Sequence, residues 1–116
     1  MTVVSLQADS ATANPTQCEI LYRAWRYAKA QWELADNDPA NPKGLTQEET
    51  DAFCDAEMSA LTAFFLAPAE NMADVARKMR VLREQAAWEL TQASAIMQRI
   101  HRDVHFQAFK IDFGDN

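Results

Sequence analysis

The segment from residue 69 to residue 113 contains neither glycine nor proline, and its apolar residues recur every three or four positions. The recurring residues are Met72, Val75, Met79, Leu82, Ala86, Leu90, Ala93, Met97, Ile100 and Val104. Such spacing puts one apolar stripe along an α-helix, with a single extra four-residue step that interrupts an otherwise heptad-like pattern. Asn71 and Asp74 resemble a helix start after Pro68, so the sequence predicts one helix over about 71–107.

A helix of about 37 residues is roughly 55 Å long, whereas a compact chain of this size is only about 30 Å across. Part of its apolar stripe would therefore lie beyond the reach of the rest of the chain. Covering that stripe with a second copy would remove costly apolar surface from water. We expect a homo-oligomer, most simply a dimer, with an interface at Met79, Leu82, Ala86, Leu90, Ala93, Met97, Ile100, Phe109, Ile111 and Phe113.

Two further helices are expected before this one. Thr16 with Glu19, and Thr46 with Glu49, have the spacing of capping boxes, and apolar residues at helical period follow each pair. The prolines and glycine of the segment 36–44 separate the two helices, and Pro68 ends the second. The expected fold is all-α: a helical hairpin or three-helix bundle, with helices at about 16–36, 46–67 and 71–107, completed by dimerisation.

The two ends of the chain have different patterns. Residues 1–14 lack periodicity, so we expect a flexible N-terminal arm before a single helical domain at 15–108. In the tail 109–116, apolar Phe109, Ile111 and Phe113 alternate with Lys110 and Asp112, a strand-like spacing. This extended aromatic tail could pack on its own bundle, cross to a second subunit or insert into a partner.

Charge is unevenly distributed along the chain, whose net charge is −6. Residues 1–70 contain eleven acids and four bases (−7), whereas residues 71–116 contain six acids and seven bases (+1). The acidic part repels phosphate, which argues against nucleic acid as the main partner. No stretch is long and apolar enough for a membrane span or a signal peptide, so we expect a cytoplasmic protein. Two cysteines make no disulfide framework.

The only two histidines, His101 and His105, are four residues apart and would share one helix face, as metal ligands do. Arg102 follows His101 where a zinc protease helix has glutamate, and neither histidine has glutamate three residues before it. Both rings are therefore better explained as polar residues near the end of a helix, with metal binding through His101 and His105 as the remote alternative.

Four bases cluster in the third expected helix: Arg77, Lys78, Arg80 and Arg83. They could contact phosphates, although no aromatic residue is interleaved among them to stack on bases. The alternative is ion pairing with the acidic helix before them, through Asp51, Asp55 and Glu57. We favour ion pairing over nucleic acid contact.

The remaining candidates for chemistry have simple structural explanations. Tyr22, Trp25, Tyr27 and Trp32 lie at helical spacing, which is typical of a core or subunit interface. Cys18 is near a helix start, which favours a thiolate, but no histidine is close to it in sequence. The only glycines are at 44 and 114, which excludes a glycine-rich phosphate loop. We therefore assign no catalytic residue, no cofactor and no enzymatic activity.

One segment resembles a known group of proteins. In residues 67–82, Pro68 and Ala69 precede a polar cap at Asn71, an acid at Asp74 and an amphipathic helix with Lys78. This arrangement is similar to a segment of small helical proteins of bacteria and their prophages that have no assigned activity. The resemblance implies a bacterial or phage setting and no site residue.

Taken together, these patterns predict a non-enzymatic interaction or scaffold protein that acts through protein–protein contacts. One form of this hypothesis is an acidic inhibitor that mimics nucleic acid with the face of residues 46–57. The alternatives are a small DNA-associated regulator that uses the basic cluster and, more remotely, a metal-binding module.

Overall fold

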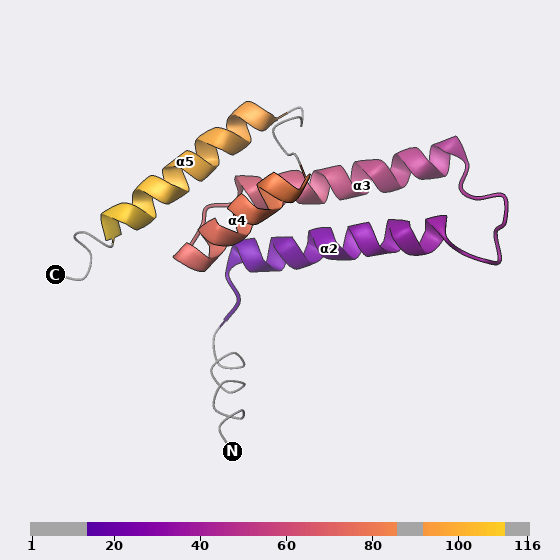
Figure 1. Cartoon of the computed structure of the whole chain (residues 1–116), viewed down its shortest axis with the longest axis horizontal. Coiled ribbons are helices and arrows are strands. Elements are labelled where there is room, and N and C mark those ends of the chain that lie inside the picture. The colour runs from indigo at the N-terminus through magenta and orange to yellow at the C-terminus, as the bar shows by residue number, and fades with distance from the viewer. Residues whose placement is uncertain (1–13, 86–91, 111–116) are drawn as a thin grey trace, which may run out of the picture.

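The computed structural model describes residues 14–85 and 92–110, and within those ranges all regular structure is helical. The helices are α2 (Gln17–Asp36), α3 (Gln47–Leu66), α4 (Met72–Gln85) and α5 (Ala93–Phe109). Figure 1 shows α2 and α3 side by side as a long antiparallel hairpin, with α4 and α5 gathered at the end away from the hairpin loop. The chain is elongated, with extents of 61 × 45 × 18 Å. The all-helical class and the bundle-like packing predicted from the sequence are confirmed.

The first two helices begin where the capping signals predict. Thr46 accepts from the Glu49 amide while the Glu49 carboxylate accepts from the Thr46 amide, which completes a capping box. That contact lowers the pKa of Glu49, because a backbone N–H stabilises its charged form. Thr16 accepts from the Glu19 amide, but the Glu19 carboxylate pairs with Arg23 instead of returning to the cap.

Short polar contacts close the loop between α2 and α3. The Asp38 carboxylate accepts from the Ala40 amide, and the Asn41 side chain donates to the Gly44 carbonyl. Gly44 adopts a φ of +78°, a left-handed conformation that costs other residues strain. These contacts hold the loop and define the far end of the hairpin.

The apolar core lies where the open end of the hairpin meets α4 and α5. It consists of Cys18, Trp25, Leu61, Phe64, Phe65, Ala67, Val81, Leu82, Ile96 and Ile100. Tilted ring pairs connect Tyr22 to Trp25 and to Phe64, with ring centroids 5.8 and 5.6 Å apart. Toward the loop the hairpin has only its own two helices to pack with, and neither α2 after Trp25 nor α3 before Glu57 contains a fully buried residue.

The prediction of one continuous helix over residues 71–107 is wrong. Lys78 Nζ lies 2.6 Å from Asp103 Oδ2, whereas residues 25 positions apart would be about 37 Å apart in one continuous helix. The segment instead forms two helices, α4 and α5, which contact each other. Their apolar stripes meet in the core of one chain, where Leu82 and Ile100 are 9% and 5% exposed. That core burial removes the reason for placing them in a dimer seam.

The other predicted interface residues have varied positions. Met79 and Met97 stay 46% and 38% exposed, and Ala93 is half-buried. Phe109 belongs to α5, with Lys110 helical after it, so the extended tail does not begin at residue 109 as predicted. Ala86, Leu90, Ile111 and Phe113, the arm residues 1–13 and the rest of the tail lie outside the described residues.

Candidate functional site

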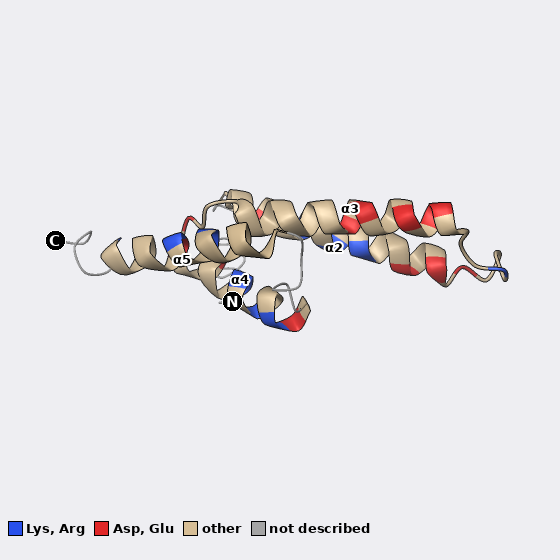
Figure 2. Cartoon of the chain, turned by 90° about the horizontal axis from the view of Figure 1, so that it is seen from above, with Lys and Arg blue, Asp and Glu red and all other residues tan. Residues whose placement is uncertain are grey.

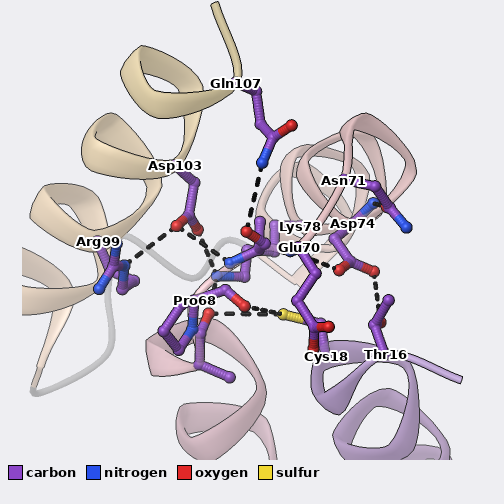
Figure 3. A network of polar contacts seen from close by, with 12 residues as sticks. Thr16, Cys18, Pro68, Glu70, Asn71, Asp74, Lys78, Arg99, Asp103 and Gln107 are labelled. Atoms are coloured by element: carbon purple, nitrogen blue, oxygen red, sulfur yellow. Dashed lines mark hydrogen bonds and ion pairs between the residues drawn. The ribbon is translucent and has the colours of Figure 1, made fainter. Parts of the chain in front are cut away.

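A buried ion pair fixes how α5 sits against α4. Lys78 is fully buried on α4 and Asp103 is 2% exposed on α5. Asp103 also accepts from Arg99 Nε and from the Ala69 amide, each at 3.1 Å, while Lys78 donates to the Ala67 carbonyl (Figure 3). The carboxylate therefore has three donors, which offset much of the cost of burying its charge. These bonds connect α4, α5 and the turn between α3 and α4.

A second set of contacts connects the same turn to the start of α2. Asp74, 1% exposed, accepts from the Thr16 hydroxyl at 2.8 Å and from the Glu70 amide at 2.9 Å. The Cys18 thiol donates to the carbonyls of Ala67 and Pro68, at 3.5 and 3.3 Å (Figure 3).

These buried polar groups are structural in their chemistry. Burial raises the pKa of the Cys18 thiol to about 11, so the effect expected from its position near a helix start is overcome. No buried side-chain nitrogen or oxygen of the described residues lacks a hydrogen-bond partner. The buried groups of the network are therefore hydrogen-bonded to one another, and the bonds of Asp103 hold α5 against α4 and the turn before it.

The orientation of α5 determines what that helix presents to solvent. Because Asp103 is its only acid and faces inward, the outer face of α5 combines cations with aromatic rings. A hollow of about 450 Å³ lies on this face, and its described lining is Arg99, His101, Arg102, His105, Phe106 and Phe109. We call these six residues the α5 surface. Phe106 and Phe109 are each 56% exposed.

A second hollow, of about 610 Å³, lies at the loop end of the hairpin. It is lined by Ala30, Glu33, Leu34, Asn37, Asp38 and Pro39, which we call the hairpin-end surface. Leu34, which belongs to this surface, is 68% exposed. Tyr27, seven residues before it on α2, is 67% exposed. Leu34 lies beside the carboxylates of Glu33 and Asp38, whereas the charged neighbours of Tyr27 along α2 are Arg26 and Lys29.

The two histidines are exposed, and their rings are 6.4 Å apart and nearly parallel. Asp103 lies on another side of the helix, as the spacing predicted. Among residues 14–85 and 92–110, no group of three histidine, cysteine, aspartate or glutamate side chains could hold a metal ion. His101 and His105 are instead part of the α5 surface.

The predicted basic cluster is divided by the structure. Lys78 is buried and cannot contact phosphate, whereas Arg80 and Arg83 are exposed on α4. The guanidinium carbon of Arg77 lies 5.0 Å from the centre of the Tyr22 ring, and its Nη1 lies 4.0 Å from Asp74 Oδ1.

The ion pairs expected with the acidic second helix do not explain this cluster, because Arg77 and Lys78 pair with Asp74 and Asp103. Glu57 is buried and accepts from Trp25 Nε1 at 3.1 Å. Asp51 accepts from Gln47 and, like Asp55, stays exposed. Trp25 lies in the core, as its helical spacing favoured, but Tyr27 does not.

Sequence reasoning missed Asp103 and Lys78 as partners, although a signal exists. Asp103 and Gln107 lie seven and eleven positions after Ile96, on the same stripe as Ile100, and all four are buried. Lys78 lies three positions after Val75 and before Val81 in the same way. Polar residues of opposite charge on two apolar stripes are candidates for a buried pair.

None of the described helices has the length and apolar character that crossing a membrane requires. No protein family model, curated protein or solved structure matches this chain.

Proposed function

We propose that this protein is a non-enzymatic interaction protein that acts through protein–protein contacts, and that the α5 surface is its main binding surface. One observation carries the proposal: α5 exposes Phe106 and Phe109 among arginines and histidines while its only acid is buried. Aromatic residues and arginine are the side chains that dominate binding energy at protein interfaces. All six described lining residues belong to α5.

The chemistry of the buried groups supports a role without catalysis. The Cys18 thiol is held protonated, and the carboxylates of Asp74 and Asp103 are occupied by several donors each. A group that takes part in proton transfer or nucleophilic attack needs access to a substrate. We place the protein in the cytoplasm of a bacterium or in a phage setting, as part of the same proposal.

A second candidate function is an acidic inhibitor. Helix α3 contains five acids and no base, and Glu48, Glu49, Asp51 and Asp55 are exposed. Such a row can imitate the phosphates of nucleic acid and occupy a basic partner. Reversing Asp51 and Asp55 to lysine should abolish capture of a basic partner while leaving contacts of α5 intact.

The two other functions suggested by the sequence, DNA binding and metal binding, would each rely on only two exposed side chains. A DNA-associated regulator would rely on Arg80 and Arg83 without Lys78, and binding to duplex DNA that is lost in Arg80→Glu would favour it. A metal-binding module would rely on His101 and His105. An unchanged metal content after both are replaced by alanine would end that hypothesis.

The test of the proposed function is affinity capture from an extract of the source cells with three baits. The baits are the wild-type protein, Phe106→Asp, and Met72→Asp as a matched control, because Met72 is 48% exposed but lies outside the α5 surface. Partners, including further copies of the chain, should bind the wild type and the control but not Phe106→Asp. Capture that is equal for all three baits would contradict the proposal.

A further inference from the structure

Helix α2 has a row of exposed apolar side chains on the side away from its buried residues. Those buried residues, Cys18 and Trp25, bond to the end of α3 and to α3 itself, and Figure 1 shows α3 alongside α2. Tyr27 lies about 160° around the helix from Trp25. Ile20, Tyr27 and Leu34 are 45%, 67% and 68% exposed and follow one another at intervals of seven residues. The row is therefore straight and about 21 Å long.

The row has the same order of side-chain sizes in both directions from Tyr27. Alanines lie three residues before and three residues after it, at Ala24 and Ala30, and both are exposed. Branched apolar residues lie seven residues before and seven residues after it, at Ile20 and Leu34. We call these five residues the α2 row. A second copy turned by 180° about an axis at Tyr27 would match the row to itself, with large side chains beside large ones and alanine beside alanine.

The hairpin-end surface provides room for such a second copy. Its hollow of about 610 Å³ lies beside Leu34, and its lining combines apolar groups with the side chains of Glu33 and Asp38. In the two-fold arrangement, Ile20 of the second copy would lie beside Leu34. Arg23 of the second copy, whose side chain is 66% exposed, would lie beside Glu33. The hollow thus offers apolar contact to one of these residues and a carboxylate to the other.

We propose that α2 forms the interface of a symmetric homodimer, in which α2 of one copy packs antiparallel on α2 of a second copy. The inference goes beyond the proposed function, because it concerns a different surface and does not involve α5. Apolar residues at seven-residue spacing are the pattern by which two helices pack along their lengths. A contact between two identical surfaces closes at two copies and does not continue into a chain.

The charges of α2 favour the antiparallel direction. This helix contains three bases and three acids, so its net charge is zero, although that of the whole chain is −6. Figure 2 shows acids at the loop end of α2 and bases before them. In the antiparallel pair, Arg23 and Glu33 of the second copy lie on the same edge and differ by about 3 Å in position along the axis. A parallel pair would set Arg23 against Arg23 and Glu33 against Glu33, and like charges at an interface oppose binding.

Arg26 does not discriminate between the two directions. It lies one residue before the axis, so it would be close to Arg26 of the second copy in either arrangement. The preference therefore depends on Arg23 and Glu33, which makes these two residues the ones to exchange in a test.

Sedimentation velocity at about 0.15 M salt measures the dimer, because this ionic strength screens the net charge of the two chains beyond about 8 Å. The row spans about four helical turns, which is a small interface, so concentrations up to about 1 mM are needed. The wild-type protein should change from monomer to dimer as its concentration rises. Tyr27→Asp places two carboxylates at the axis and should weaken the dimer at least about tenfold. Met72→Asp, the same change at an exposed residue outside α2, should dimerise like the wild type.

A charge exchange tests the direction. Arg23→Glu alone and Glu33→Arg alone each set like charges together twice in the antiparallel dimer, so each should weaken it about fivefold or more. The double variant restores opposite charges and the wild-type net charge, so it should recover most of the wild-type affinity. Arg80→Glu, at an exposed position on α4, changes the net charge as much as Arg23→Glu does and should leave the dimer unchanged. Circular dichroism and thermal unfolding check that every variant folds.

Three results would overturn the proposal. The first is a wild-type protein that stays monomeric up to about 1 mM. The second is equal dimerisation of Tyr27→Asp and Met72→Asp, which would place the interface elsewhere. The third is full affinity in both single charge variants, which would exclude the antiparallel pair. A monomeric wild type that captures a different protein through Tyr27 would assign the α2 row to that protein instead.

The outcome is separate from that of the proposed function. Phe106→Asp should leave the dimer intact, and Tyr27→Asp should leave capture through the α5 surface intact. Loss of both activities in either variant would mean that the two surfaces are not independent, and would contradict an interface on α2 alone.

Discussion

Removing one member of the buried Lys78–Asp103 pair should destabilise the protein strongly. In Asp103→Leu, Lys78 would keep only the Ala67 carbonyl as a partner while remaining fully buried. Breaking a buried ion pair from one side typically costs about 3–5 kcal/mol of unfolding free energy. Whole domains of this size are stable by only about 5–15 kcal/mol, so this single change should remove a large fraction of the stability.

Removing Lys78 instead of Asp103 should lower the unfolding free energy by less. In Lys78→Met, Asp103 keeps two donors, Arg99 Nε and the Ala69 amide, each at 3.1 Å. We expect a loss of about 2–3 kcal/mol, typical of a charged hydrogen-bonding group that loses one of several partners. The double variant removes both charges together, so its loss should be smaller than the sum of the two single losses by about 2 kcal/mol or more.

The measurement is urea unfolding at neutral pH followed by far-UV circular dichroism, with the denaturant slope compared across all variants. If Asp103→Leu does not fold, Asp103→Asn provides a milder change that keeps an acceptor for the Ala69 amide. Strict additivity of the two single losses in the double variant would refute the argument, because it would mean that the two charges do not interact. A loss for Lys78→Met that exceeds that for Asp103→Leu would contradict the assignment of donors.

Three further predictions concern individual side chains. Burial raises the pKa of Cys18 from 9.0 to about 11, so the stability contributed by the neutral thiol is fully present below pH 9 and is lost as pH rises through 11. At pH 10 the loss of unfolding free energy should be on the order of 1 kcal/mol and should vanish in Cys18→Ala, as measured by urea unfolding against pH. Trp25→Phe removes the donor to the buried Glu57 carboxylate and should cost about 1–3 kcal/mol, whereas adding Glu57→Leu should recover part of that loss in the same assay. Gly44→Ala should lower the unfolding free energy by about 1 kcal/mol through backbone strain alone, because no atom lies within 4 Å of the added Cβ. Gly44→Asn should lower it less, and thermal unfolding of both variants measures the difference.

Local signals in the sequence predict the hairpin well. The helices that start after Thr16 and Thr46 begin one residue beyond their caps, and the proline-containing loop separates them as expected. Capping residues, prolines and glycines act on their own neighbours along the chain, so their effect does not depend on the rest of the fold. Each of these features can therefore be inferred without knowing how the helices pack against one another.

The third expected helix failed because apolar spacing does not identify the surface that covers a stripe. Leu82 and Ile100 fit a seam between two copies as well as they fit a contact between two halves of one segment. What decides between these arrangements is the pairing of Lys78 with Asp103, which are 25 positions apart. No local rule connects two residues at that separation, so the candidate site on α5 could not be placed from the sequence.

Folding the segment back on itself also changes which interaction surface the protein has left. A seam built on Leu82 and Ile100 would have been apolar, and its strength would change little when salt is added. Those side chains are now in the core, and the most exposed large apolar groups on α5 are Phe106 and Phe109, beside Arg99 and Arg102. A contact with a partner at this surface would include charge pairs near water, which salt screens over about 10 Å at moderate ionic strength. The salt dependence of partner binding therefore distinguishes the two origins: weakening with salt indicates the α5 surface, whereas insensitivity to salt would indicate an apolar seam.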